Sequence, residues 1–185
     1  MGNIKKIKKS YARPLKPWDM SRMEEEKVID QKYGLKNKRE IWRAQAIIRT
    51  FRRNARHILS LPSEEAVKRK ADLINKLAHI GLIESSATLD DVLGLKTEDI
   101  LNRRLQTIIF KKGLAHTVKQ ARQIIVHGHV IVNGRVNNAP STIIPADIEN
   151  TINVNPKFKV VEKVEKAPKA APTPDVQPAK KEAAA

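Results

Sequence analysis

The feature that most constrains the fold is the segment 101–136, where two amphipathic helical patterns run directly into a hairpin signal. In the first pattern, apolar residues recur at i, i+4, i+7 and i+8, namely Leu101, Leu105, Ile108 and Ile109. This spacing predicts one helix with a single buried face, because residues three or four positions apart lie on the same side of a helix. Gly113 then ends the predicted helix, as glycine commonly does at a helix C-terminus.

The second pattern begins at Thr117, and Gln120 follows three residues later at the spacing of a capping box. Gly128 ends this second helix, and residues 129–132 then predict a strand. The Asn133-Gly134 dipeptide comes next, and it tolerates the positive φ angles of a tight hairpin turn. The segment therefore predicts two helices followed by a β-hairpin.

Positive charge dominates this segment, since residues 101–146 contain no Asp or Glu. The whole chain of 185 residues carries a net charge of +16, with basic regions on both sides of a nearly balanced stretch at 63–100. Two basic regions of this kind are typical of a protein that binds nucleic acid. We expect the segment to bury one side and to present on the other side cations that have no acidic neighbour in the local sequence. These cations are Arg103, Arg104, Lys111, Lys112, Lys119, Arg122 and Arg135.

The RRL motif, the KGLA turn and the sequence TVKQARQIIVHGHVIVNGRV at 117–136 together resemble the S4 RNA-binding domain. This family is a small module of two helices and a hairpin, found in one small-subunit ribosomal protein, in some tRNA synthetases and in pseudouridine synthases. The resemblance implies that one face of the module binds RNA. The residues expected there are Arg103, Arg104, Lys111, Lys119, Arg122, Gln123, His127, His129 and Arg135.

A second basic region precedes the module, in a long helix predicted over residues 38–61, whose only acidic residue is Glu40. Its arginines suit phosphate oxygens and base edges, because the guanidinium is a planar fork of donors. The predicted buried stripe is Ile41, Ala44, Ile48, Phe51, Ala55, Ile58 and Leu59. The residues expected to bind RNA are Arg43, Arg49, Arg52, Arg53 and Arg56.

The segment KNKREIWRAQAIIRTFRRNAR at 36–56 is similar to the N-terminal region of the archaeal and eukaryotic forms of the small-subunit ribosomal protein four family. This second match favours that family over synthetases and pseudouridine synthases, whose large catalytic domains do not fit in the chain. The absence of cysteine favours the archaeal form.

The resemblance implies a structural constituent of the cytoplasmic small ribosomal subunit, and a primary rRNA-binding protein that organises a multi-helix junction of the 5′ domain during assembly. It also implies a position near the path by which mRNA enters, with an influence on decoding accuracy. The implied partners are small-subunit rRNA, small-subunit ribosomal protein five and mRNA.

We expect an α+β fold that is mainly helical, in which a helical N-terminal subdomain packs on the αα-plus-hairpin module. The predicted parts are a basic arm at 1–17, a helical domain at 18–100, the module at 101–160 and a disordered Pro/Ala/Lys tail at 161–185. The alternating residues 151–154 are expected to add a strand to 129–132. Tyr11 and Trp18 lie among cations, where aromatic rings can stack on bases.

Several kinds of site are not expected. The chain has no cysteine, and it shows no nucleophile motif, phosphate-cradling loop or dinucleotide fingerprint. His127 and His129 are close in sequence, but no Cys, Asp or Glu beside them completes a tetrahedral metal site. No apolar run approaches the roughly 20 residues of a membrane span. We therefore expect no catalysis, cofactor, metal or membrane contact.

Two other hypotheses stay open on the sequence. One is a free-standing RNA-binding factor with the same module, and the other is an RNA-modifying enzyme without recognisable motifs. Binding to an acidic protein or an anionic membrane fits the charge, but not an arginine-rich helix combined with an RNA-binding module.

Overall fold

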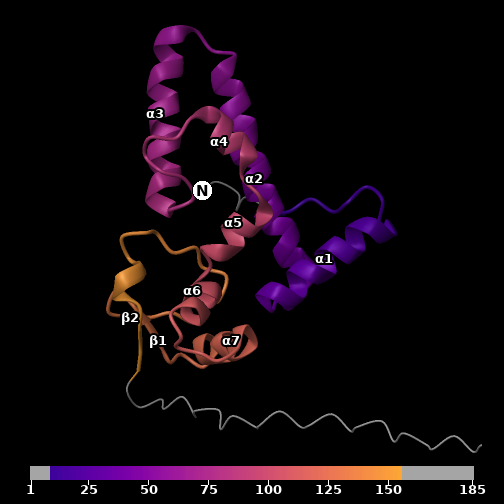
Figure 1. Ribbon diagram of the computed structural model, residues 1–185, viewed down its shortest axis with the longest axis vertical. Coiled ribbons are helices and arrows are strands. Elements are labelled where there is room, and N and C mark those ends of the chain that lie inside the picture. Colours follow the sequence, from indigo (N-terminus) through magenta and orange to yellow (C-terminus); the bar gives the residue numbers. More distant parts are fainter. Residues whose placement is uncertain (1–8, 156–185) are drawn as a thin grey trace, which may run out of the picture.

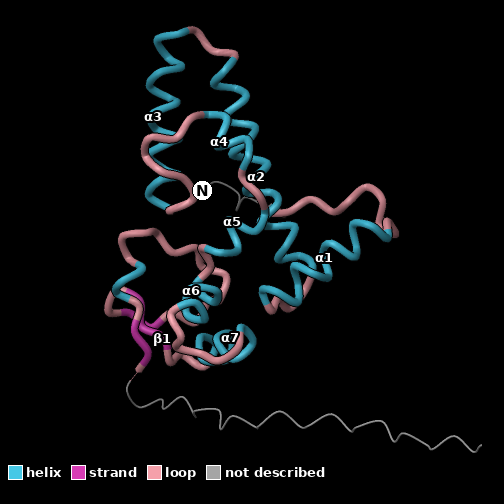
Figure 2. The backbone as a smooth tube through the Cα atoms, viewed as in Figure 1, coloured by secondary structure: helices cyan, strands magenta, loops and turns pink. Residues whose placement is uncertain are grey.

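The computed structural model describes residues 9–155 (Figure 1). The whole of the predicted disordered tail, 161–185, and the first residues of the predicted arm, 1–8, lie outside the described residues. Helices form most of the described chain, and its strands occur only between residues 130 and 154 (Figure 2). The predicted fold class, α+β and mainly helical, is therefore confirmed.

The N-terminal part is arranged along one long helix, α2 (Lys38–Leu59). α3 (Ser63–Ile80) returns beside α2 as the second arm of a helical hairpin, whereas α1 (Met20–Tyr33) lies against the N-terminal end of α2 (Figure 1). The short helices α4 (Leu89–Gly94) and α5 (Thr97–Asn102) also pack against α2. α2 is thus the common packing partner of this part.

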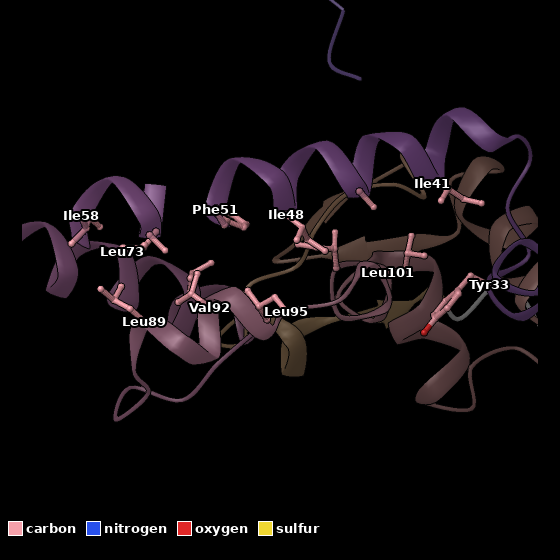
Figure 3. Close-up of a cluster of buried hydrophobic side chains, with 14 of the residues drawn as sticks. Tyr33, Ile41, Ile48, Phe51, Ile58, Leu73, Leu89, Val92, Leu95 and Leu101 are labelled. Carbon is pink, nitrogen blue, oxygen red and sulfur yellow. The ribbon is translucent and has the colours of Figure 1, made fainter. Parts of the chain in front are cut away.

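The apolar stripe of α2 supplies the core of the N-terminal part (Figure 3). Leu73 of α3, Val92 of α4 and Leu101 of α5 pack against it. The predicted stripe is confirmed except at Leu59, which is 62% exposed. Leu59 is the last residue of α2, where the chain turns toward α3 and leaves this side chain uncovered.

The C-terminal part contains a three-stranded antiparallel sheet in the order β2-β1-β3. β1 (Val130–Val132) pairs with β2 (Arg135–Val136) and with β3 (Asn153–Val154). The hairpin turn is confirmed, because Asn133 and Gly134 have φ angles of 50° and 76°. The predicted strand at 151–154 is confirmed only in its second half, since Glu149–Thr151 form a 3-10 helix.

Two helices cover this sheet, α6 (Leu105–Lys111) and α7 (Val118–Val126), and they form a second core with β1. α7 begins as predicted, because the Thr117 hydroxyl accepts a hydrogen bond of 3.1 Å from the backbone N–H of Gln120. The largest side chains of this core with no exposed surface are Leu105, Ile109, Ile125 and Val130.

The prediction of one continuous helix from Leu101 to residue 111 is wrong, because the structure has two helices there, α5 and α6. The break lies at Arg103 and Arg104, where the segment after β2 pairs with the backbone. The N–H of Ile144 donates to the carbonyl of Arg103 (3.0 Å), and the N–H of Leu105 donates to the carbonyl of Thr142 (2.8 Å). Leu101 therefore belongs to the N-terminal core and Leu105 to the second core.

Candidate RNA-binding surface and the contacts that position it

The arginines predicted to bind RNA from α2 divide into two groups. Arg52 is partly buried and donates a hydrogen bond of 2.5 Å to the carbonyl of Leu95, so it joins α2 to the segment before α5. The other four are exposed, and the helical period places them opposite the buried stripe. These four are Arg43, Arg49, Arg53 and Arg56.

The residues predicted to bind RNA from the C-terminal module also divide into an exposed group and a group held by contacts within the protein. Lys119 and Gln123 lie one turn apart on the exposed face of α7, as their spacing predicts. Nine residues were expected on the RNA-binding face, and the exposed ones are Lys111, Lys119, Gln123, His127 and Arg135. We define the exposed surface cations as Lys111, Lys119 and Arg135 together with Arg43, Arg49, Arg53 and Arg56.

Arg104 and Arg122 instead converge on Glu40 of α2. Arg104 is only 5% exposed, and its guanidinium lies 2.7 Å from one carboxylate oxygen of Glu40. Arg122 reaches the other oxygen at 2.8 Å. No acidic residue lies near these two cations in the sequence, but in the fold they meet one, whose position is more than sixty residues earlier in the chain. RNA contact by either arginine stays a prediction.

The electrostatics of the Glu40 cluster favour the ionised carboxylate. Burial alone raises the pKa of the Glu40 carboxyl, but hydrogen bonds and charges from Arg122 and Arg104 outweigh burial and lower the pKa below its usual value. The cluster thus joins the N-terminal part to the module through two ion pairs that are largely shielded from water.

Arg103 is held in a similar way within the C-terminal part. Its guanidinium donates to the carboxylate of Glu149 (2.8 Å) and to the carbonyl of Ile144 (3.1 Å). Lys112 also donates to the backbone carbonyl of Glu149. These bonds fasten the segment after the hairpin to the break between α5 and α6.

Gln106 was missed by the sequence analysis and is the most buried polar residue of the interface between the two parts. Its side chain is 1% exposed, and its amide nitrogen lies within 3.0–3.2 Å of the carbonyls of Tyr33, Gly34 and Val118. The signal available in the sequence was a single amide inside the apolar run of α6. Such a residue, if buried, must find hydrogen-bond partners.

Gly34 makes the approach of the two parts possible. It ends α1 with a φ of 54°, a left-handed conformation that favours glycine, and a Cβ placed there would lie 3.3 Å from the side chain of Val118. Gly34 is therefore both a helix end and a point of close contact with α7.

The histidines do not form a metal site in the part of the chain that the structure describes. The rings of His127 and His129 lie 6.3 Å apart and nearly parallel, at 18°. Within residues 9–155, no three His, Cys, Asp or Glu side chains gather closely enough to hold a metal ion. None of the helices in this range has the length and apolar character needed to cross a membrane.

Comparison with known protein families divides the chain at the same place as the two cores. The model for the "Ribosomal protein S4/S9 N-terminal domain" matches residues 3–102, and the model for the "S4 domain" matches residues 103–147. The boundary falls between Leu101 of the first core and Leu105 of the second.

Similar proteins cover most of the chain. Small ribosomal subunit protein uS4 of Sulfurisphaera tokodaii is 50% identical over 157 residues, which are 84% of this chain and 89% of the relative. The protein of the same name from Methanothermobacter thermautotrophicus is 42% identical over 167 residues, 90% of this chain and 98% of the relative. The one from Saccharolobus solfataricus is 48% identical over 162 residues.

The fold and these matches define the class of the protein, a ribosomal protein with an S4 domain at its C-terminal side. The chain belongs to the family of small ribosomal subunit protein uS4. This is a family of structural ribosomal proteins and not of enzymes, so membership removes the hypotheses of an RNA-modifying enzyme and of a free-standing factor.

Proposed function

We propose that this chain acts in the cytoplasm as a primary binder of rRNA in the small ribosomal subunit and organises a multi-helix junction of the 5′ domain during assembly. The observation that carries the proposal is the separation of the exposed surface cations into two groups, one on α2 and one on the module. The Glu40 cluster and Gln106 hold the two groups at a fixed distance and orientation.

The chemistry of the exposed surface cations suits the RNA backbone. Each Lys or Arg that meets a phosphate releases condensed counterions, and this release drives binding. A-form RNA hides its base edges in a deep, narrow groove, so a rigid protein surface recognises the positions of phosphates and 2′-hydroxyls. Two rigidly joined basic surfaces therefore suit a junction of RNA helices better than a single helix.

The arginines that are held by contacts within the protein have a different role in this proposal. Arg103, Arg104 and Arg122 hold the module in place through Glu149 and Glu40, and Arg52 holds α2 to the segment before α5. We assign RNA contact first to the exposed surface cations. The four held arginines act on RNA binding mainly by positioning.

The proposal includes two further relationships, which the resemblance to this family suggests. The assembled subunit places the chain beside small-subunit ribosomal protein five, near the path by which mRNA enters, where its basic residues influence decoding accuracy. Chemical cross-linking of assembled small subunits tests both, through cross-links from the exposed cations to that protein and to mRNA.

Hydroxyl-radical footprinting tests the main proposal. The full chain bound to the isolated 5′ domain of small-subunit rRNA is expected to protect backbone positions in several helices that meet at one junction. A variant with Lys111, Lys119 and Arg135 all changed to Gln should lose one part of the footprint and keep the part made by α2. Protection spread evenly along the RNA would contradict the junction role.

A further inference from the structure

An open groove lies at the N-terminal end of the described chain. Residues before α1 arch from the side of α2 to the start of α1 (Figure 1), and together these three segments enclose a groove of about 510 Å³. Its apolar lining includes Pro17, Trp18, Met23 and Trp42.

A buried carboxylate, which is not itself part of the lining, holds the walls of the groove together. Glu26 is 2% exposed and accepts hydrogen bonds from Arg22 (2.6 Å) and from the indole Nε1–H of Trp42 (3.0 Å). The same Arg22 guanidinium donates to the carbonyls of Lys16 and Pro17, at 3.1 and 2.9 Å. One ion pair therefore holds the arm, α1 and α2 together.

The aromatic residues of the groove are placed for stacking. The hydrogen bond to Glu26 fixes the ring of Trp42, and the ring of Tyr11 packs near it with centroids 6.0 Å apart and a tilt of 35°. Trp18 is 85% exposed although it is a large apolar side chain, so a flat apolar surface is open to solvent. An exposed indole beside a fixed one is a suitable platform for a planar ligand.

The charge of the lining selects the class of ligand. The lining contains no acidic residue but four cationic ones, namely Arg13, Arg22, Lys38 and Arg39. Arg13 and Arg39 are exposed and form no ion pair with any group in residues 9–155. Aromatic surfaces combined with cations are the usual means of holding single-stranded nucleic acid, with bases on the rings and phosphates on the cations.

We propose that this groove binds an unpaired nucleotide of RNA, with the base stacked on Trp18 and the adjoining phosphates contacted by Arg13 and Arg39. This rests on the proposed RNA-binding function and adds to it a base-stacking site outside both groups of exposed surface cations. The site recognises an extruded or single-stranded base, whereas those cations recognise the backbone of helices.

The chain offers a direct probe, because its two tryptophans both line the groove. A short single-stranded oligoadenylate added to the full chain should quench tryptophan fluorescence. An abasic oligomer of the same length and an acidic peptide, polyglutamate, should leave it nearly unchanged. Equal quenching by the abasic oligomer would overturn the proposal by showing attraction to charge alone, and stronger quenching by the peptide would assign the groove to a protein partner.

Substitution of Trp18 gives an independent measurement, and its exposure makes a folding defect avoidable. Trp18→Leu should weaken the binding of labelled oligoadenylate, followed by anisotropy, by about tenfold, the loss expected for one stacked base. Trp18→Phe keeps an aromatic ring and should restore most of the affinity. Val67→Ala, an exposed apolar position on α3, is the matched control and should change nothing.

The same variants separate this proposal from the one on which it rests. If Trp18→Leu binds oligoadenylate as tightly as the unaltered chain while both bind 5′-domain rRNA, the groove proposal is wrong and the rRNA role stands. If the unaltered chain binds neither RNA, both are wrong.

Discussion

The carboxylate of Glu40 accepts a hydrogen bond of 2.7 Å from the guanidinium of Arg104, across the boundary between the N-terminal part and the module. Arg122 completes the cluster from α7 at 2.8 Å. Glu40 is the acidic residue of an otherwise basic helix, and its structural role is to bind two arginines of the module. Without Glu40, the positive charges of these arginines and of α2 would repel one another. The cluster connects the orientation of the two parts to RNA binding.

Glu40→Gln is expected to lower the free energy of unfolding by about 2–3 kcal/mol, because it leaves two largely buried guanidiniums without a counter-charge. RNA affinity should fall by roughly tenfold, because the two cationic groups then no longer engage together. Denaturant titration and filter binding measure the two effects.

The direction of the affinity change makes this a strict test. Removing a negative charge from a protein that binds RNA strengthens binding if charge alone matters. Glu24→Gln, an exposed position on α1, changes charge by the same amount and is the matched control. Tighter binding by Glu40→Gln, as by the control, would contradict the positioning role.

Stability should also depend on acid pH. The folded pKa of Glu40 is lowered from its usual value of 4.5, by Arg122 and Arg104 against the opposing effect of burial, so the folded state binds its proton more weakly than the unfolded state. Its stabilisation is therefore complete above pH 4.5 and is lost as the pH falls through the lower folded pKa. Burial raises the pKa of Glu26, but hydrogen bonds from Trp42 and Arg22 outweigh burial and lower the pKa below its usual value. Glu26 therefore also contributes stability that is lost at acid pH.

The measurement is the free energy of unfolding at neutral pH and at about pH 3.5, roughly one unit below the usual pKa of a Glu side chain. The unaltered chain should lose more stability than Glu40→Gln over this interval, because the variant has no proton to bind at this position. Identical losses in the two proteins would show that the cluster does not titrate with folding.

Gln106→Leu should destabilise the chain by about 1–3 kcal/mol, because it leaves buried carbonyls of Tyr33, Gly34 and Val118 without their donor. Gln123→Leu is the matched control, since the same change on the exposed face of α7 removes no buried hydrogen bond. Thermal unfolding should show a lowered midpoint only for the first variant. An unchanged midpoint for Gln106→Leu would mean that water or another donor replaces the amide.

Lys119→Gln and Arg135→Gln should each weaken rRNA binding and lower the salt slope by about 0.7–0.9, the value for one lost phosphate contact. Both side chains are exposed, so the free energy of unfolding should not change. Affinities measured over a range of salt concentrations give the slope. Unchanged slopes for both variants would show that this face does not meet phosphates.

Local sequence patterns predicted the elements that depend on interactions between residues close together in the sequence. The stripe from Ile41 to Ile58 has the period of a helix and is buried, and the Thr117 cap and the Asn133-Gly134 turn depend only on neighbouring residues. The exposure of Lys119 and Gln123 followed from the same periodicity.

Contacts between distant segments were not predictable in this way. Leu101 and Leu105 have the spacing of one helical face, yet the returning segment at 142–144 pairs with the backbone between them and breaks the helix. Glu40 and Arg104 are separated by 64 residues, so no local charge count could pair them. The exposed residues of the candidate surface could therefore be predicted from the sequence. The buried contacts that position this surface could not.

The most direct test of the account is the binding of the full chain to the isolated 5′ domain of small-subunit rRNA, titrated in salt beside a non-cognate RNA. We expect tight binding with a clear preference for the cognate junction that persists at high salt, and a loss of that preference in Glu40→Gln. Equal and equally salt-sensitive binding to both RNAs would contradict the account, because it would mean that the cations attract RNA without recognising the shape of a junction.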